Sequence, residues 1–471
     1  MKPLQLSPED FRRLAERAVE ETTRYLTGLE QRPTFPKTSG AETSTLFGGA
    51  CPEKGLGPAA LEEVGKIFDH ARPCNGRFFG YVFGSGESVA AVGDLIASIV
   101  NQNVTAWRSG PAAVTVEHTV VGWLADAIGC KGFGGSLCGG GSSANLMALA
   151  MAREAKAPAN QRGAQAGVVY ASEQVHMSIP KALALLGLGH DALRFIPTDR
   201  GYRVRVDELR SALRADREAG KRIIAIVGSA GTVNTGAIDP LEELAALAGE
   251  YGGWFHVDGA YGALAAIAAP EKFRGLALAD SISLDPHKWL YQPVDCGCLL
   301  YHDPAAARAA FSHSGDYARV LSQDPVEGFA FFEESMELSR RFRALKLWLS
   351  LRYHGLGAFR DAIARDLAHA QRLVRNIQAR PELELLGGGE LSAVCFRCKT
   401  SDADKANAAI LKRVLARGKV YISNATLREG FALRACFVNH RTTEADVDTI
   451  VEEVLAAAAE VGAAGIAHVS R

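Results

Sequence analysis

From Gly167 to Tyr301, short apolar runs alternate with segments whose apolar residues recur at helical spacing. The short runs are rich in β-branched residues and predict six strands: GVVYAS, LRFIPT, RIIAIVG, WFHVD, SISLD and GCLLY. Two of the intervening segments predict amphipathic helices that end at glycine, VDELRSALRADREAG and PLEELAALAGEYGG. This alternation predicts an α/β fold, in which a mostly parallel sheet is covered by helices and joined by right-handed crossovers.

The pattern changes after Arg340, where a long helical segment, RRFRALKLWLSLRYHG, is followed by strands and helices in a new order. Its strand candidates are LELLGG, SAVCFRC and FALRACFVN. We therefore predict a large domain at 76–350 and a smaller α+β domain at 351–471. Residues 1–75 predict two helices joined by Pro-rich loops, too little to bury a core alone. We expect this segment to pack on the large domain or on a second subunit.

Charge and hydropathy exclude several classes of partner. The 471 residues carry 52 Lys plus Arg against 53 Asp plus Glu, with no basic block of the kind that follows a phosphate backbone. Nucleic acid is therefore not expected as a partner. The apolar stretches are shorter than the about 20 residues that a membrane-spanning helix needs. The first residues predict a charged amphipathic helix and no secretory signal, so a cytoplasmic location is expected.

Nine cysteines in a chain of this length suit reduced thiols better than a disulfide framework. Cys395 and Cys398 have CxxC spacing, but they lie in a strand-like run with no second ligand pair nearby. Cys296 and Cys298 alternate in another predicted strand. We expect buried structural roles for these thiols, in preference to metal or redox chemistry, and we predict no metal site.

Unusual polar residues follow four of the predicted strands. His176, Thr232 and Asp258 follow three of them, and His287 and Lys288 follow the fourth. Ligand-binding residues of an open parallel sheet gather beyond the carboxyl ends of its strands. We therefore expect a lysine, an aspartate, two histidines and a hydroxyl to meet at one edge of the sheet.

This set of residues suits pyridoxal 5′-phosphate. Lys288 is flanked by apolar Trp289 and Leu290, and partial desolvation favours the neutral amine that forms a Schiff base. Asp258 is the candidate carboxylate that keeps the pyridine nitrogen protonated. Taken singly, a lysine is most often a solvated surface charge and an aspartate after a strand a turn or helix cap. Their combination in HVDGAYG and DPHKW favours the cofactor.

The cofactor phosphate requires donors, and a glycine-rich helix start offers backbone N–H groups. Gly139 to Ser143 precede the predicted helix ANLMALAMAREA, which makes Gly141 and Ser142 candidate donors. Glycine runs of this kind also occur in dinucleotide folds and ordinary turns, but no GxGxxG pattern supports a nicotinamide site. His176 is a candidate to stack on the pyridine ring, with a structural histidine as the alternative. His287 is a candidate phosphate contact or proton shuttle.

Together these segments resemble the group II pyridoxal-phosphate-dependent decarboxylases, which act on aromatic amino acids, histidine and glutamate. The segments that carry the likeness span nearly the whole chain: NGRFFGYVFG, GPAAVTVEHTVVGWL, GGGSSANLMALAMAREA, ASEQVHMSIPKAL, GTVNTGAIDP, WFHVDGAYG, DSISLDPHKWL and SRRFRALKLW. The resemblance implies an aspartate-aminotransferase-type (type I) fold with a seven-stranded large-domain sheet. It also implies a homodimer with active sites at the interface and N-terminal helices wrapped around the partner.

By this resemblance the protein decarboxylates an L-amino acid through a Schiff base on Lys288 and a quinonoid intermediate. Relatives commonly carry a loop tyrosine that helps protonate Cα; the corresponding residue here is Phe331, and Tyr317 lies upstream. Phenylalanine at this position resembles plant aldehyde synthases, which decarboxylate and oxidatively deaminate their substrates. Aldehyde formation is therefore the main alternative. Asp285 stands where some relatives have an asparagine near the phosphate.

The substrate side chain is expected to be aromatic. Phe79, Tyr81 and Trp107 lie in segments that line the substrate pocket by resemblance, although core packing is an alternative reading of all three. Arg108 would instead suit an acidic side chain. Arg434 is a candidate carboxylate contact or a structural residue.

Two further functions remain open. Another lyase of the same fold would cleave a carbon–carbon bond of a different kind, as the sphingosine-phosphate lyases do. A non-catalytic nucleotide-binding protein on a doubly wound sheet is a remote alternative, since fold does not dictate function.

Overall fold

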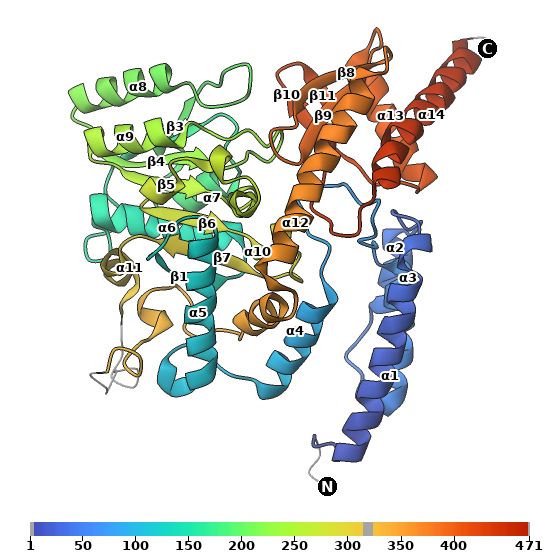
Figure 1. The fold of residues 1–471 in the computed structure, drawn as a ribbon, viewed down its shortest axis with the longest axis horizontal. Helices are drawn as coiled ribbons and strands as arrows, with labels where there is room; N and C mark the ends of the chain where they lie inside the picture. Colours follow the sequence, from blue (N-terminus) through green and yellow to red (C-terminus); the bar gives the residue numbers. More distant parts are fainter. Residues whose placement is uncertain (1–3, 314–323, 470–471) are drawn as a thin grey trace.

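The computed structural model describes residues 4–313 and 324–469 (Figure 1), so Tyr317 lies outside the described residues. Its larger sheet has seven strands in the order β1-β7-β6-β5-β4-β2-β3. Their bounds are β1 Gly134–Cys138, β2 Val168–Ser172, β3 Leu193–Ile196, β4 Ile223–Ser229, β5 Trp254–Asp258, β6 Ser281–Leu284 and β7 Gly297–Tyr301. β2 to β6 are parallel to one another, and β7 runs antiparallel to both β6 and β1. The predicted mostly parallel seven-stranded α/β sheet is confirmed.

β1 is the strand that the apolar pattern did not reveal. Its sequence, GGSLC, holds two glycines and no β-branched residue, so it has little strand propensity of its own. Among the described strands it lies at the edge of the sheet and pairs with β7 alone. Its position is nevertheless important, because it leads directly into the glycine segment at 139–141.

Helices cover both faces of this sheet. One core contains buried residues of α5, α8 and α9, and the other contains buried residues of α6, α7 and α11. The helix bounds are α5 Pro111–Ala127, α6 Gly141–Lys156, α7 Ser178–Leu185, α8 Val206–Glu218, α9 Leu241–Tyr251, α10 Pro286–Trp289 and α11 Pro304–Phe311. Because both faces are covered, β2, β4, β5, β6 and β7 are buried along their whole length, which explains their almost continuous apolar sequences.

The C-terminal part contains a second, antiparallel sheet in the order β10-β11-β9-β8. Its elements are α12 Ala344–Gln378, β8 Leu383–Gly388, β9 Ala393–Cys398, α13 Ala403–Arg417, β10 Ser423–Leu427, β11 Gly430–Cys436 and α14 Glu444–Val469. It has its own core, which confirms the predicted smaller α+β unit. α12 runs from the large sheet to the small one (Figure 1) and contains one non-helical residue, Gly355, at φ 75°.

The N-terminal segment is helical, with three helices where the sequence predicted two: α1 Pro8–Thr27, α2 Gly40–Phe47 and α3 Glu62–His70. α1 has no buried residue and projects away from the two sheets (Figure 1). α4, Ser88–Val100, also keeps apolar residues exposed, among them Val92, Leu95 and Ile99. No helix within residues 4–313 or 324–469 is both long and apolar enough to cross a bilayer.

Candidate active site

The carboxyl ends of β2, β4, β5 and β6 meet the start of α6 around a cavity of about 300 Å³. Seven of the predicted site residues line it: Gly141, Ser142, His176, Thr232, Asp258, His287 and Lys288. They come from segments far apart in the sequence, and the parallel order of the strands brings them to one edge of the sheet. Asn145 and Asp285 line the same cavity.

Lys288 belongs to α10, the short helix that follows β6. Its Nζ lies 2.8 Å from the nearer carboxylate oxygen of Asp285, and its side chain is 17% exposed. Helix geometry produces this pair, because residues three apart on a helix lie on the same face. The amine is thus largely shielded from solvent and held at one point of the cavity wall.

Asp258, at the end of β5, receives three hydrogen bonds. Asn145 Nδ2 and Ser283 Oγ each donate to it over 3.1 Å, and the Ala260 amide donates over 3.3 Å. An ionised carboxylate can only accept, so these three donors match its charged form. The residue is buried, with 7% of its surface exposed.

Behind Asp258, Asn145 and His256 form a buried polar chain with a consistent direction. The Asn145 amide uses its N–H groups on Asp258 and on Ser178 Oγ, so its oxygen accepts from His256 Nε2, 2.9 Å away. His256 Nδ1 lies 3.0 Å from Ser281 Oγ and 3.2 Å from the Ser281 carbonyl. Burial lowers the pKa of His256 to about 4, so the ring is neutral and carries its single proton on Nε2.

The same chain fixes the ring of His176. Ser178 Oγ accepts from Asn145 and lies 2.8 Å from His176 Nδ1, which also accepts from the Ser178 amide. Nδ1 is therefore the unprotonated nitrogen, and Nε2 carries the hydrogen. Burial lowers the pKa of His176, which keeps the imidazole neutral.

The start of α6 forms a cradle that has no room for side chains. A Cβ added at Gly141 would lie 2.5 Å from Ala260 Cβ, and one added at Gly297 would lie 2.4 Å from Gly140 Cα. Gly140 itself has φ 144°, which glycine adopts without strain. The Ser143 and Ala144 amides donate to the Gly140 carbonyl, so the N–H groups of Gly141 and Ser142 are the ones that can bind an anion at this helix start.

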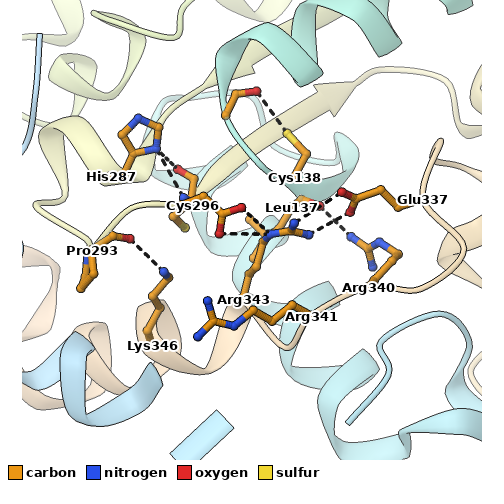
Figure 2. Close-up of polar contacts among 12 residues, drawn as sticks. Leu137, Cys138, His287, Pro293, Cys296, Glu337, Arg340, Arg341, Arg343 and Lys346 are labelled. Carbon is orange, nitrogen blue, oxygen red and sulfur yellow. Dashed lines mark hydrogen bonds and ion pairs between the residues drawn. The ribbon is translucent and has the colours of Figure 1, made fainter. Parts of the chain in front are cut away.

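His287 lies beside this cradle. Its Nδ1 is 2.8 Å from the Cys296 carbonyl, to which it donates (Figure 2), so in the neutral ring Nε2 is the acceptor. Nε2 lies 3.6 Å from the Asp285 carboxylate. Burial lowers the pKa of His287. The Cys296 carbonyl therefore determines the tautomer of His287, with the hydrogen on Nδ1 and the unprotonated Nε2 toward the cavity.

A buried ion pair holds β1 in place ahead of the cradle. Arg340 donates to the Leu137 carbonyl over 2.7 Å (Figure 2), and Glu117 accepts from the Leu137 amide over 2.9 Å. Arg340 and Glu117 also pair with each other, and both are buried. Their side chains thus occupy the edge of β1 that has no neighbouring strand, and they position the chain three residues before Gly140.

A side chain of the small sheet holds the loop after β4 in place by hydrogen bonds. Arg434, on β11, donates to the carbonyls of Val233 and Asn234 in this loop and to the Tyr81 carbonyl. Thr232 Oγ1 accepts from the Ala237 amide, which closes the loop at the cavity wall. The guanidinium of Arg434 is therefore engaged with backbone groups, which favours the structural alternative for this residue.

The family model described as the pyridoxal-dependent decarboxylase conserved domain matches residues 72–399, well over half of the chain. The chain belongs to this family. It is 34% identical to an aromatic-L-amino-acid decarboxylase of Bacillus atrophaeus, with 97% of each chain covered. It is 29% identical to a phenylacetaldehyde synthase of Petunia hybrida, covering 91% of this chain and 90% of the relative. The solved structure of Oryza sativa TDC with PLP and tryptamine superimposes with a TM-score of 0.90 at 27% identity, covering 98% of this chain and 99% of the other.

This decarboxylase requires pyridoxal phosphate, and the cavity fits it by its own chemistry. An amine on Lys288 and a carboxylate on Asp258 with three donors stand at different points of the wall. The glycine cradle leaves backbone N–H groups uncovered, and any Cβ at Gly141 would fill it. Among the described residues, no group of three or more His, Cys, Asp or Glu side chains is arranged to hold a metal ion.

The decarboxylase keeps its central cysteines as buried, free thiols. Burial raises the pKa of Cys296 and of Cys395 to about 12 and that of Cys398 to about 11, so all three stay protonated. Cys298 is buried as well. These surroundings favour the structural role that the sequence predicted.

The structure does not bring the predicted substrate-pocket residues to this cavity. Phe79 is buried in the small-sheet core against Phe437, with ring centroids 5.2 Å apart. Tyr81 is 51% exposed and bonds through its hydroxyl to Tyr421. Trp107 packs against the large core. None of these three side chains lines the cavity of its own subunit.

Phe331 and Arg108 also lie away from the cavity. The Phe331 ring is fully buried, and Arg340 Cζ lies 4.3 Å from its centroid. Phe329 packs on it edge to face. Arg108 is exposed beside Trp107. In this subunit Phe331 is a core residue, held by the same arginine that fixes β1.

Sequence reasoning missed the residues that support Asp258. Asn145 lies within a predicted apolar helix and His256 within a predicted buried strand, so both are polar residues at core positions. That mismatch was the available signal, because a buried polar group requires partners. Their partnership joins residues 111 positions apart, which no local pattern reveals.

Replacing Asn145 with leucine, which has a similar volume, should weaken cofactor binding and destabilise the fold. The change removes one donor from Asp258 and leaves the buried Nε2–H of His256 without an acceptor, which costs about 1–3 kcal/mol. Ser283→Ala is the matched control, since it removes one donor from Asp258 and leaves His256 satisfied. Urea unfolding and cofactor titration measure both effects; equal losses in the two variants would argue against the role of Asn145.

Proposed function

We propose that this protein decarboxylates an aromatic L-amino acid to its amine, with pyridoxal phosphate held covalently on Lys288. The observation that carries the proposal is the convergence of Lys288, Asp258, His176 and the glycine cradle on one cavity in a chain of this family. The aromatic substrate class rests on the Bacillus atrophaeus aromatic-L-amino-acid decarboxylase and on the Oryza sativa structure with tryptamine.

The bound cofactor supplies an electron-withdrawing ring that weakens the bonds to the substrate Cα, provided that its ring nitrogen stays protonated. Asp258 is the group that holds the proton on that nitrogen, since its three donors keep the carboxylate fixed and charged. His176 presents a neutral, oriented imidazole to stack on the ring. Gly141 and Ser142 donate to the phosphate, while His287 and Thr232 border the cofactor.

Proton transfer to the substrate carbon falls to the side chains that face the cavity. Lys288 Nζ and His176 Nε2–H are the candidates, because both residues line the cavity and both groups carry hydrogens. Their burial also excludes bulk water from the reacting atoms, which strengthens every electrostatic contact there.

The substrate pocket is completed, we infer, by a second copy of the chain. α1 has no buried residue but exposes Phe11, Val19 and Leu26, and α4 exposes a further apolar group. A homodimer with two-fold symmetry would bury both helices. It would also add residues of the second copy to a cavity whose own lining includes the aromatic residue Tyr261. Sedimentation equilibrium of the holoenzyme should give the mass of two chains.

The same reasoning supports a domain division at 1–75, 76–350 and 351–471. The two sheets have separate cores, and the N-terminal helices belong to neither. α12 joins the two larger units, because it begins at Ala344 and ends at Gln378. A cytoplasmic location accords with the nine free cysteines.

Aldehyde formation is the second candidate. Phe331 replaces the usual loop tyrosine and has no proton to give, and the Petunia hybrida relative is a phenylacetaldehyde synthase. Against this alternative, the Phe331 ring is buried beneath Arg340 and does not line the cavity of its own subunit. Decarboxylation to the amine therefore remains our first proposal.

The substrate class is tested by carbon dioxide release from a panel of aromatic, acidic and basic L-amino acids. We expect kcat/KM for the best aromatic substrate to exceed that for glutamate and lysine by more than about 10²-fold, the discrimination that a matched pocket gives. Preferred turnover of an acidic amino acid would overturn the aromatic assignment and direct attention to Arg108.

A further inference from the structure

Asp285 puts an anionic side chain where the cofactor phosphate is expected. The residue follows β6 and is 2% exposed. A Cβ added at Gly140 would lie 3.8 Å from its Oδ1, and one added at Gly141 would lie 3.1 Å from its Oδ2. The carboxylate therefore faces the first turn of α6, the same turn that offers N–H donors to an anion.

One oxygen of the Asp285 carboxylate has cationic or polar partners, and the other has no hydrogen-bond partner among the described residues. Oδ2 lies 2.8 Å from Lys288 Nζ and 3.6 Å from His287 Nε2. Oδ1 is buried and has no hydrogen-bond partner among the described residues. A buried acceptor without a donor is uncommon in native proteins, so this oxygen points to a partner that binds here.

Attachment of the cofactor to Lys288 changes which hydrogen-bond donors Asp285 has. When Lys288 Nζ condenses with the cofactor aldehyde, two of the three ammonium hydrogens leave with the aldehyde oxygen as water. Asp285 thus loses donors at the same time as a phosphate ester, whose second pKa is about 6, enters the adjacent cradle. Two anionic groups repel each other in one buried site, and a proton held between them removes this penalty.

We propose that Asp285 shares a proton with the cofactor phosphate, so that binding of pyridoxal phosphate takes up one proton. The inference rests on the proposed function, because it takes the cofactor as given. The proton comes from solvent and is held between a carboxylate oxygen and a phosphate oxygen as a short O–H···O contact. The Asp285 carboxylate and the phosphate are both acceptors, and this proton is the hydrogen that lets them bond to each other.

The other titratable groups near Asp285 are poor carriers of this proton. Two are carboxylates with donors of their own, since Asp258 accepts three hydrogen bonds and Asp295 pairs with Arg343. The others are Lys288, His287, His176, Cys138 and Cys296. Burial lowers the pKa of both histidines, and it raises the pKa of both thiols to about 12. Lys288 is consumed by the attachment. The carboxylate and the phosphate are therefore the pair that takes up the proton.

The sign of the pH dependence follows. Because binding takes up a proton, affinity is fully present below about pH 6, the second pKa of a free phosphate ester, and falls as the pH rises. One proton corresponds to about a tenfold loss of affinity per pH unit. An asparagine, which is neutral and can donate from its amide, should remove this dependence.

The test is calorimetric titration of apoprotein with pyridoxal phosphate, for wild type and Asp285→Asn, in buffers of different ionisation enthalpy. We expect wild type to take up about one proton more than the variant at pH values of about 7 to 8. We also expect its dissociation constant to rise about tenfold more per pH unit. Pyridoxal, which lacks the phosphate, should give the same proton count for both proteins.

Two variants separate Asp285 from its neighbours. Asp295→Asn removes another carboxylate near the cradle, one that is paired with Arg343 at 3.3 Å, and should keep the wild-type proton count. His287→Gln should also keep it. Equal proton counts in wild type and Asp285→Asn, or loss of the extra proton in His287→Gln alone, would overturn the inference. Failure of wild type to bind the cofactor at every pH would refute the proposed function as well.

Discussion

Lys288→Ala is expected to abolish turnover, with a loss of more than about 10⁴-fold, the upper end for removal of one proton-transferring group. The loss should exceed that range because the variant also lacks the amine that attaches the cofactor. Carbon dioxide release measures the turnover. Mass spectrometry after borohydride reduction should find the cofactor on the Lys288 peptide of wild type and on no peptide of the variant.

Two further variants control for indirect effects. Lys288→Arg keeps a positive charge beside Asp285, so it should fold and melt like wild type, but its guanidinium does not condense with an aldehyde. Lys181→Ala removes an exposed lysine of α7 and should retain full activity. Substantial turnover by Lys288→Ala, or reduced cofactor on another lysine of wild type, would contradict the assignment.

Arg340→Met should destabilise the protein by about 3–5 kcal/mol, the cost of breaking a buried ion pair. The Arg340 and Glu117 side chains are 1% and 0% exposed, so the glutamate left behind has no access to water. The variant also removes donors from the carbonyls of Leu137 and Val104. Urea unfolding followed by circular dichroism measures the change in stability. Cofactor affinity should fall in parallel, because Leu137 leads into the glycine cradle.

Arg341→Met is the matched control, one residue further along. Arg341 pairs with Asp94 at 3.1 Å, but its side chain is 47% exposed, and such a pair contributes at most about 1 kcal/mol. The double variant Arg340→Met with Glu117→Leu should recover part of the loss, since it leaves no buried charge. Recovery should be incomplete, because the Leu137 amide and carbonyl stay unpaired. Equal unfolding of the Arg340 and Arg341 variants would refute this role of the buried pair.

The fold was predictable wherever local sequence carries the period of a strand or helix. The six apolar runs all became strands of the large sheet, because a strand buried on both faces needs an almost continuous apolar sequence. The sequence did not predict β1 and β10, and the physical reason is the same for both. GGSLC and SNATL have weak strand propensities, and the position of β1 is set by the distant partners Glu117 and Arg340.

The site residues that follow strands could be predicted from the sequence. The direction in which side chains of irregular segments point could not. Lys288, Asp258 and His176 follow strands, so the parallel order of the sheet places them together. Phe79 and Tyr81 lie outside any strand or helix, where sequence does not determine which way a side chain points. Tyr81 adopts a positive φ of 59° and turns outward, whereas Phe79 enters the small-sheet core.

The central claim is that this protein converts an aromatic L-amino acid to its amine and carbon dioxide. The most direct test follows one reaction of the holoenzyme with its best aromatic substrate, recording carbon dioxide, amine, aldehyde and peroxide together. Phe331→Tyr is run in parallel. The account predicts one amine for each carbon dioxide, without peroxide, from both proteins. Aldehyde with stoichiometric peroxide from wild type, and amine only from Phe331→Tyr, would contradict it.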